Sequence, residues 1–495
     1  MLHSLTGIRK RSLLWASLGI GAMFLLPEMA LGAEISGEDL GSKLPLWSVI
    51  PFVGILLSIA LMPLLAPQVW HHHFGKVAAG WAVLLAAPFW LVYREAAFHE
   101  LAHIILIDYV PFIIVLWGLF TIGGGIVLKG SLVGRPATNV ALLLIGTIMA
   151  SWVGTTGAAM LLIRPLIRAN AWRHHKQHII IFFIFLVANI GGSLTPLGDP
   201  PLLLGFIHGV PFFWTMALLP AMLVAVALIL AIFYLVDVYY MKKEAHPPPE
   251  HSGPQEPMHI EGAHNFIFLL GVLLLVLFSG SVQMSEITVL GIHLAWQDII
   301  RNFGIVVMGW LSLKTTSRAL RTANDFSWAP ILEVAYLFAG IFITIIPALV
   351  MLRAGSEGAM AFITELVEEP WQYFWVTGIL SSFLDNAPTY LTFFNTALGK
   401  LRLTEEEVSA FLTTGETLAV AGPAALATFE QLLYAISMGA VFMGAVTYIG
   451  NAPNFMVRAI AEENGIEMPS FFGFMFWSVI ILMPIFVIIT FIFLR

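Results

Sequence analysis

Long apolar runs recur along the chain, and most approach the roughly 20 residues that an α-helix needs to cross a bilayer. Uninterrupted runs predict membrane spans at 44–66, 77–92, 111–128, 211–240, 266–282, 303–313, 328–352 and 471–494. Further apolar runs are broken by Gly, Pro and small polar residues at 136–168, 178–208, 371–398 and 431–458. The pattern predicts an all-α polytopic membrane protein.

Composition strengthens this prediction. Hydrophobic residues make up 59% of the chain and charged residues 11%, whereas a soluble domain carries roughly 25% charged residues. The net charge of -7 gives no basic face, so nucleic acid is not expected as a partner. The chain has no cysteine, which excludes disulfides and thiolate metal sites. No cofactor is expected.

The N-terminus has the layout of a secretory signal peptide. Arg9, Lys10 and Arg11 precede the apolar run 13–26, and small residues follow up to Ala33. Residues 1–33 are therefore predicted to be a signal peptide, with an uncleaved first helix as the alternative. In either case, the chain that follows should face the periplasm of a bacterial inner membrane.

A hydrophilic linker, residues 241–265, divides the chain into a first repeat, 34–240, and a second, 266–495. The linker is rich in Pro and His. Its histidines are interpreted as part of a solvated segment in the cytoplasm rather than as a metal site.

Loop charges predict the course of the interrupted segments. Both ends of 136–168 are positive, and positive loops stay in the cytoplasm. The basic residues are Lys129, Arg135, Arg164, Arg168, Arg173 and Lys176. This segment should therefore be a re-entrant hairpin. Acidic residues flank 371–398, and alternation of the spans places those flanks outside.

Each half then contains three spans, a re-entrant hairpin, a broken helix and a final span. The two halves have inverted topology, with the mature N-terminus and the C-terminus both periplasmic.

The repeat is visible in the residues. Gly, Thr, Gly, Asp or Asn, and Pro coincide without a gap when 192–201 is laid over 444–453. The hairpin tips, 151–155 and 382–386, match more loosely. Corresponding interruptions in two halves indicate the binding site of a secondary transporter.

Irregular backbone inside a membrane survives only where it is buried in protein or lines a wet cavity. The four interruptions should therefore share one polar site. Candidate oxygen ligands are Ser151, Thr155, Thr156, Ser193 and Thr195 in the first half, and Ser381, Ser382, Asn386, Thr389, Thr447, Asn451 and Asn454 in the second.

Asp199 and Asp385 are the ionisable members of this set and the expected sodium ligands. A carboxylate inside the membrane is costly and indicates function. The alternative is a structural one, since Asp shortly before Pro is also a favoured helix N-cap.

One motif points to another class of protein. The sequence His99-Glu100-Leu101-Ala102-His103 fits HExxH, in which two imidazoles bind zinc and Glu acts as base. An intramembrane zinc protease is therefore a remote alternative, because no further ligand or protease signature accompanies the motif.

The strings GTTGAAMLLIRPLIRAN, NIGGSLTPLGDPPLLLGF, SSFLDNAPTYLTFFN and YIGNAPNFMVRAIAE resemble the ion transporter superfamily, with NhaD-type sodium/proton antiporters and a citrate transporter branch the most similar. The resemblance covers nearly the whole chain from Leu44. It implies two inverted repeats, a homodimer in membrane lipid and elevator-like alternating access. It maps Ser382, Asp385, Asn386 and Thr389 onto the second hairpin site. Thr195 and Asp199 map onto the first broken helix.

The first hairpin tip departs from the antiporter pattern, because Gly154-Thr155 stands where relatives carry Asp-Asn. The first hypothesis is a sodium (or lithium)/proton antiporter in which cation and proton compete for Asp385, assisted by Asp199. The alternative is cation-coupled transport of citrate or a similar carboxylate.

Overall fold

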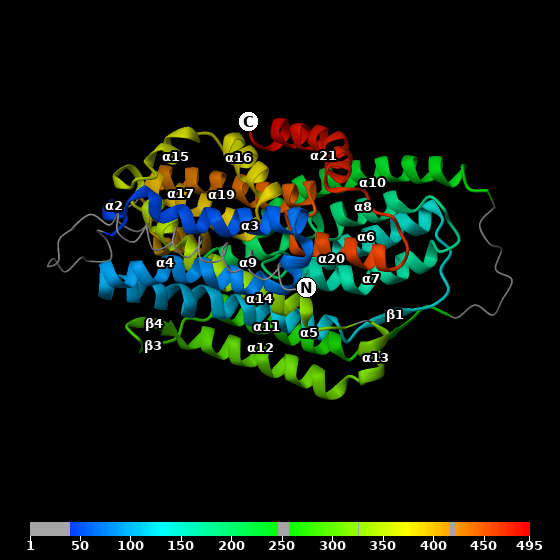
Figure 1. The fold of residues 1–495 in the computed structure, drawn as a ribbon, viewed down its shortest axis with the longest axis horizontal. Helices are drawn as coiled ribbons and strands as arrows, with labels where there is room; N and C mark the ends of the chain where they lie inside the picture. The colour runs from blue at the N-terminus through cyan, green and yellow to red at the C-terminus, as the bar shows by residue number, and fades with distance from the viewer. Residues whose placement is uncertain (1–39, 246–256, 325, 416–421) are drawn as a thin grey trace, which may run out of the picture.

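The computed structural model describes residues 40–245, 257–324, 326–415 and 422–495, and helices form nearly all of it (Figure 1). Within these residues, eight helical segments are long and apolar enough to cross a membrane. The predicted all-α polytopic membrane fold is confirmed. The predicted signal peptide, 1–33, lies outside the described residues, as does most of the linker's first half.

The two halves contain the same succession of elements. The first half has α3 (Ile50–Leu65), α4 (Pro67–His103), α5 (Val110–Gly123), a hairpin of α6 (Pro136–Val153) and α7 (Thr155–Ala169), a broken helix of α8 (Gln177–Leu186) and α9 (Pro200–Ile207), and α10 (Leu219–Met241). The second has α11 (Asn265–Ser281), α12 (Trp296–Thr315), α14 (Ala329–Arg353), a hairpin of α16 (Pro370–Phe383) and α17 (Asn386–Leu401), a broken helix of α19 (Pro423–Met443) and α20 (Ala452–Glu463), and α21 (Phe471–Phe493).

Shorter elements join these helices. They are α2 (Leu40–Lys43), α13 (Arg318–Ala323), α15 (Ala361–Leu366), α18 (Glu405–Thr414), the 3-10 turns η2 (Leu46–Val49), η4 (Ile190–Leu194), η5 (Trp214–Leu218), η6 (Gly355–Glu357) and η7 (Gly444–Val446), and the π-helical turn η3 (Ile104–Tyr109). Strand β1 (Val127–Lys129) pairs with β2 (His259–Glu261), and β3 (Glu286–Val289) with β4 (Ile292–Ala295), both antiparallel. The end of the linker is therefore bound to the first half.

Two predicted spans are too short. The run 77–92 lies within α4, which has 37 residues and leaves helical geometry at Arg94, where φ is 44°. The run 303–313 lies within the longer helix α12. Asp298 and Arg301, which come before the run on the same helix, pair at 2.7 Å. That internal pairing allows a helix to continue through charged positions that hydropathy reads as loop.

Each hairpin returns to the end from which it starts. The Gly134 amide donates to the Ala169 carbonyl at the base of the first hairpin (2.7 Å). At the base of the second hairpin, Lys400 Nζ donates to the Val367 carbonyl (2.5 Å). In Figure 1 the hairpin of α6 and α7 lies on the right and the hairpin of α16 and α17 on the left.

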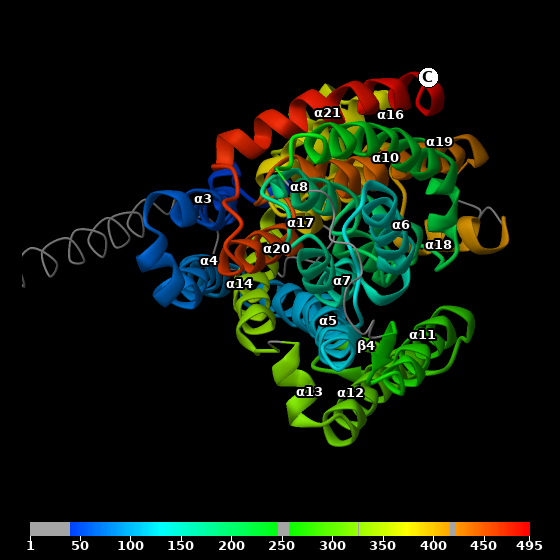
Figure 2. The same ribbon diagram turned by 90° about the vertical axis from the view of Figure 1, so that its right-hand side faces the viewer.

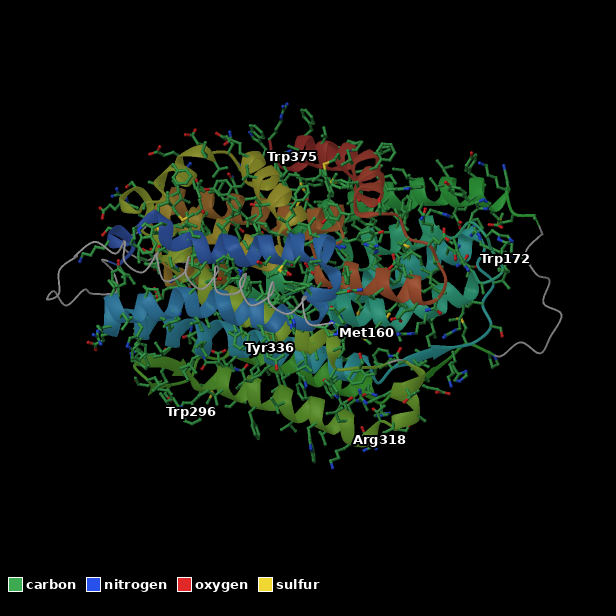
Figure 3. The ribbon with its side chains drawn as sticks, in the orientation of Figure 1. Met160, Trp172, Trp296, Arg318, Tyr336 and Trp375 are labelled. Carbon is green, nitrogen blue, oxygen red and sulfur yellow. The ribbon has the colours of Figure 1, made fainter. Side chains whose placement is uncertain are left out.

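The helices divide into two packed groups. The framework consists of α3, α4, α5, α11, α12 and α14, which pack mainly on one another. The hairpin unit consists of both hairpins, both broken helices, α10, α18 and α21. Figure 2 shows α8, α17 and α20 inside this unit and α11 and α12 on the framework side. In Figure 3, Trp296 and Arg318 lie toward opposite ends of that framework face.

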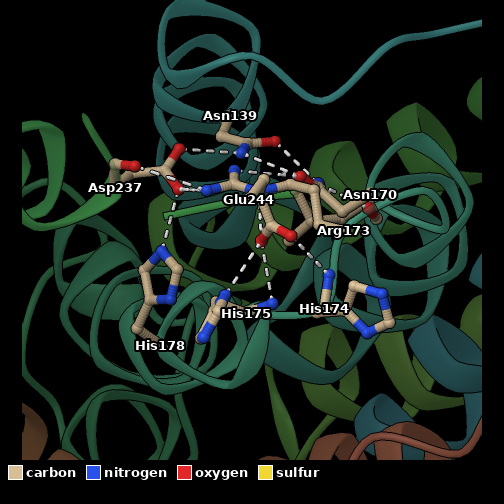
Figure 4. Close-up of polar contacts among 9 residues, drawn as sticks. Asn139, Asn170, Arg173, His174, His175, His178, Asp237 and Glu244 are labelled. Atoms are coloured by element: carbon tan, nitrogen blue, oxygen red, sulfur yellow. Dashed lines mark hydrogen bonds and ion pairs between the residues drawn. The ribbon is translucent and has the colours of Figure 1, made fainter. Parts of the chain in front are cut away.

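Buried polar contacts hold the base of the first hairpin (Figure 4). Arg173 Nη2 lies 2.6 Å from Asp237 Oδ1, and both side chains are fully buried. Asn139 Nδ2 donates to Asp237 Oδ2 (2.9 Å), and His178 Nε2 lies 2.8 Å from Asp237 Oδ1. Asn139 and Asn170 also bond to each other. The network connects α6, the end of α7, α8 and α10.

The membrane topology remains a prediction that labelling can test. The chain has no native cysteine, so single cysteines at Arg135 and Trp172 should react only from the cytoplasm. Cysteines at Glu368 and Glu406 should react only from the periplasm. Impermeant maleimides added to intact cells and to inverted vesicles measure this, and labelling of positions 135 and 172 from opposite faces would contradict it.

Candidate functional site

Each hairpin tip is fastened to the break of its own half in the same way. Thr195 Oγ1 donates to the Ser151 carbonyl in the first half, and Thr447 Oγ1 donates to the Ser382 carbonyl in the second. These are the residues that coincide when the two motifs are aligned. Each threonine hydroxyl also accepts from the amide two residues later, at 3.2 Å and 3.1 Å.

The repeated glycines are explained by close backbone approach. A Cβ atom at Gly198 would lie 2.1 Å from the Gly192 carbonyl oxygen, and one at Gly450 would lie 2.6 Å from the Gly444 carbonyl oxygen. No real side chain tolerates such contacts, so only glycine permits each break to fold onto itself. The first broken helix is also enclosed by protein, because 89% of the segment Gln177–Leu194 is buried.

Asp199 is the centre of the site. Its carboxylate is 2% exposed and accepts hydrogen bonds from Thr155 Oγ1 (3.1 Å), Asn386 Nδ2 (2.6 Å) and Asn451 Nδ2 (2.8 Å). These donors come from both hairpins and from the break of the other half. Asp199 occupies the N-cap position of α9 but makes no capping bond, so its side chain serves the site.

Four helices begin at this carboxylate. Thr155 and Asn386 open α7 and α17, and Asp199 and Asn451 precede α9 and α20. Helix N-termini carry partial positive charge and stabilise anions.

Asp385 occupies a different environment. It is half-buried, and its Oδ1 accepts from the Ala387 amide at 3.1 Å, which makes it the N-cap of α17. The residue therefore has the capping contact that the alternative interpretation expected.

The remaining candidates bond mainly to nearby backbone. The contacts are Ser151 Oγ to Gly191 O (2.5 Å), Ser193 Oγ to Ile190 O (2.9 Å), Ser381 Oγ to Ala440 O (2.7 Å), Ser382 Oγ to Met443 O (2.9 Å) and Thr389 Oγ1 to Asp385 O (3.0 Å). Thr156 lies partly buried in the first turn of α7.

Asn189 was not among the predicted residues. It immediately precedes η4 and donates from Nδ2 to Asn454 Oδ1 at 2.6 Å, across the two halves. A single asparagine within the apolar string FIFLVANIGG was the available signal. Among the buried atoms of the described residues, Asn189 Oδ1 and Asn386 Oδ1 accept no hydrogen bond.

The Asn189 and Asn386 side chains lie near the same glycine. A Cβ built at Gly444 would be 3.0 Å from Asn189 Oδ1 and 3.6 Å from Asn386 Nδ2. Buried acceptors are normally paired, so the unpaired carboxamide oxygens of Asn189 and of Asn386, which itself bonds to Asp199 through Nδ2, fit the ligand preference of a hard cation.

The HExxH motif lies apart from this site, at the end of α4. The rings of His99 and His103 stack with centroids 6.4 Å apart, and His103 Nδ1 lies 4.0 Å from Asp108. The described residues hold no cluster of three His, Cys, Asp or Glu side chains that would bind a metal ion.

The family model described as "Putative citrate transport" matches residues 41–494. The chain therefore belongs to this family, and it is a polytopic membrane transporter of the citrate transporter branch. The curated proteins include no match to the chain.

Proposed function

We propose that the protein is a sodium (or lithium)/proton antiporter in which cation and proton compete for Asp199, with Asp385 as the second carboxylate. The observation that carries the proposal is the burial of Asp199 among neutral donors from both halves. In the described part of the chain, neither Asp199 nor Asp385 forms an ion pair.

A buried carboxylate without a cationic partner is expensive. It must be neutralised either by a proton or by a bound metal cation, and the two cannot occupy it together. Asn189 Oδ1 and Asn386 Oδ1 would complete the oxygen shell of a cation held by Asp199. Mutual exclusion of this kind is the physical basis of exchange.

The donors of Asp199 tie the first broken helix to both hairpins, so the site would travel as one body. The hairpin unit would move against the framework in an elevator-like manner, carrying whichever ion is bound. We place the protein in a bacterial inner membrane, with dimer contacts made by the framework.

Citrate is the second candidate substrate. Its support is the family match over 41–494 together with the four helix N-termini at Asp199, which favour carboxylates. The site residues named above include no Lys or Arg, so a citrate anion would depend on helix dipoles and on co-bound cations.

Flux measurements separate these candidates. Protein in proteoliposomes with an internal pH indicator should move protons when a sodium or lithium gradient is applied, and a potassium gradient of equal size should not. Parallel vesicles are tested for sodium-driven uptake of labelled citrate. Citrate uptake without sodium-driven proton movement would reject antiport and favour the second candidate.

A further inference from the structure

A chain of charged side chains crosses from the framework to the hairpin unit, at the end of α9 opposite Asp199. We name it the outer ion chain, and it consists of Asp108, His208, Glu405 and Arg353. His208 Nε2 lies 2.8 Å from Asp108 Oδ1, and His208 Nδ1 bonds to Glu405 Oε2 at 2.9 Å. Arg353 Nη2 lies 2.7 Å from Glu405 Oε1.

The chain is built into the fold rather than left on the surface. Asp108 and His208 are 1% and 3% exposed. Asp108 stands in the π-helical turn η3, a distortion that often marks functional positions in helices. The next residue, Tyr109, donates its hydroxyl to the Ala335 carbonyl of α14 (3.0 Å), which fixes the turn against the framework.

The four residues divide between the two packed groups. Asp108 and Arg353 belong to framework helices, whereas His208 follows α9 and Glu405 opens α18 in the hairpin unit. If the unit leaves the framework, His208 keeps Glu405 and Asp108 keeps its neighbour His103 at 4.0 Å. Arg353 is 36% exposed and can be hydrated. Separation therefore leaves no buried charge without a partner, which would otherwise be costly.

We propose that Asp108, His208 and Glu405 form a proton-binding site that favours docking of the hairpin unit on the framework. This inference rests on the movement in the proposed function but not on the transported ion. Docked, the imidazolium of His208 faces two carboxylates, and undocked it faces one. It therefore binds its proton more tightly when docked.

The sign of the pH dependence follows by linkage. His208 binds its proton more tightly in the docked state, so protonation stabilises docking. This stabilisation is fully present below the pKa that His208 has when undocked, and it is lost as the pH rises through the pKa that His208 has when docked. Low pH should favour docking and high pH should favour separation.

The other groups around His208 agree with this sign. Burial would raise the pKa of Glu405, but His208 and Arg353 outweigh it and lower that pKa to about 2. Glu405 therefore remains an anion throughout the relevant range. From α4, His103 lies 4.0 Å from Asp108, and the charge of Glu100 acts on His103. From α17, Phe394 contributes a ring 5.9 Å from His208, and Asn395 bonds to Arg353 (2.5 Å).

Distances between spin labels test the proposal. Labels are attached to cysteines at exposed Gln283, beyond α11 of the framework, and exposed Thr413 in α18. Pulsed dipolar spectra of the full chain in nanodiscs should show one short distance at pH 6 and a growing longer distance up to pH 10. In Asp108→Asn, the midpoint should move down by at least about one pH unit, a tenfold loss of differential proton binding.

Two further variants keep the test decisive if Asp108→Asn does not insert. His208→Lys holds its charge to about pH 10 and should show mainly the short distance. His208→Gln should give the same spectrum at pH 6 and pH 10. Identical pH profiles in wild type, Asp108→Asn and His208→Lys would overturn the proposal, as would a wild-type spectrum that does not change with pH.

The two measurements, of distance and of flux, distinguish failure of this proton site from failure of the proposed antiport. A pH-dependent distance without sodium-driven proton flux would reject antiport and leave this proton site standing. Flux with a distance that does not depend on pH would reject the proton site alone.

Discussion

Asp199→Asn should reduce sodium-driven proton movement in proteoliposomes to less than about a tenth of the wild-type rate, while the protein still folds and inserts. The substitution removes the charge that would bind the cation, and a hydrogen bond to a charged group is worth about 1.5–3 kcal/mol. The fold should tolerate the change because Asn386 can rotate its carboxamide and present its unpaired Oδ1 to the new amide.

The ranking of the two carboxylates is the sharper part of this prediction. Asp385→Asn should impair transport less, because its Oδ1 has a capping role at α17 that an asparagine also performs. Glu333→Gln, near the start of α14, should be milder still and serves as the matched control. Full antiport in well-inserted Asp199→Asn, or a larger loss in Asp385→Asn than in Asp199→Asn, would contradict the central role of Asp199.

Sequence reasoning located the hairpins and breaks because their chemistry is local. Gly192 and Gly198 match Gly444 and Gly450, and these pairs prove to be close backbone contacts in both halves. Thr195 and Thr447 likewise make equivalent bonds to Ser151 and Ser382. An interruption in an apolar run is visible in hydropathy. Its repetition in the other half indicates that it is a structural feature of both repeats and not an isolated irregularity.

The contacts that were missed join residues far apart in the chain. Asn189 bonds to Asn454, and His208 lies between Asp108 and Glu405. Nothing in the local pattern around a single polar residue shows which distant residue it meets. The sequence hypothesis ranked Asp385 above Asp199, and the proposed function reverses this order, because both residues precede a proline and only the tertiary structure distinguishes their partners.

Charge rules also gave Arg173 a simpler role than it has. The sequence interpretation treated it as one of several positive loop residues, and the structure buries it fully against Asp237. A topology rule counts the charge but carries no information on whether the side chain is solvated. The pair appears only when α7 and α10 are brought together.

Removing the cation of this pair should therefore destabilise the protein strongly. Arg173→Met leaves Asp237 as a buried charge without its guanidinium, which typically costs about 3–5 kcal/mol. The apparent melting temperature in detergent, followed by fluorescence-detected size exclusion, should fall by several degrees. The hairpin base should also become accessible to proteases, because Asn170 loses the guanidinium that donates to it and Asp237, which accepts from Asn139, loses its cation.

A double-mutant cycle shows whether the pair itself is responsible. Asp237→Asn alone leaves Arg173 with only the more distant Glu244, 3.9 Å away, and the asparagine keeps one acceptor oxygen for either His178 or Asn139. Combined with Arg173→Met, it removes both charges, so the double variant should lose clearly less than the sum of the two single losses. The exposed pair Arg458–Glu462 provides the control, since Glu462→Gln should change the melting temperature little. If the Arg173→Met protein melts at the wild-type temperature, or if the losses of stability in the two single variants add strictly in the double variant, the buried pair does not hold the first hairpin in place.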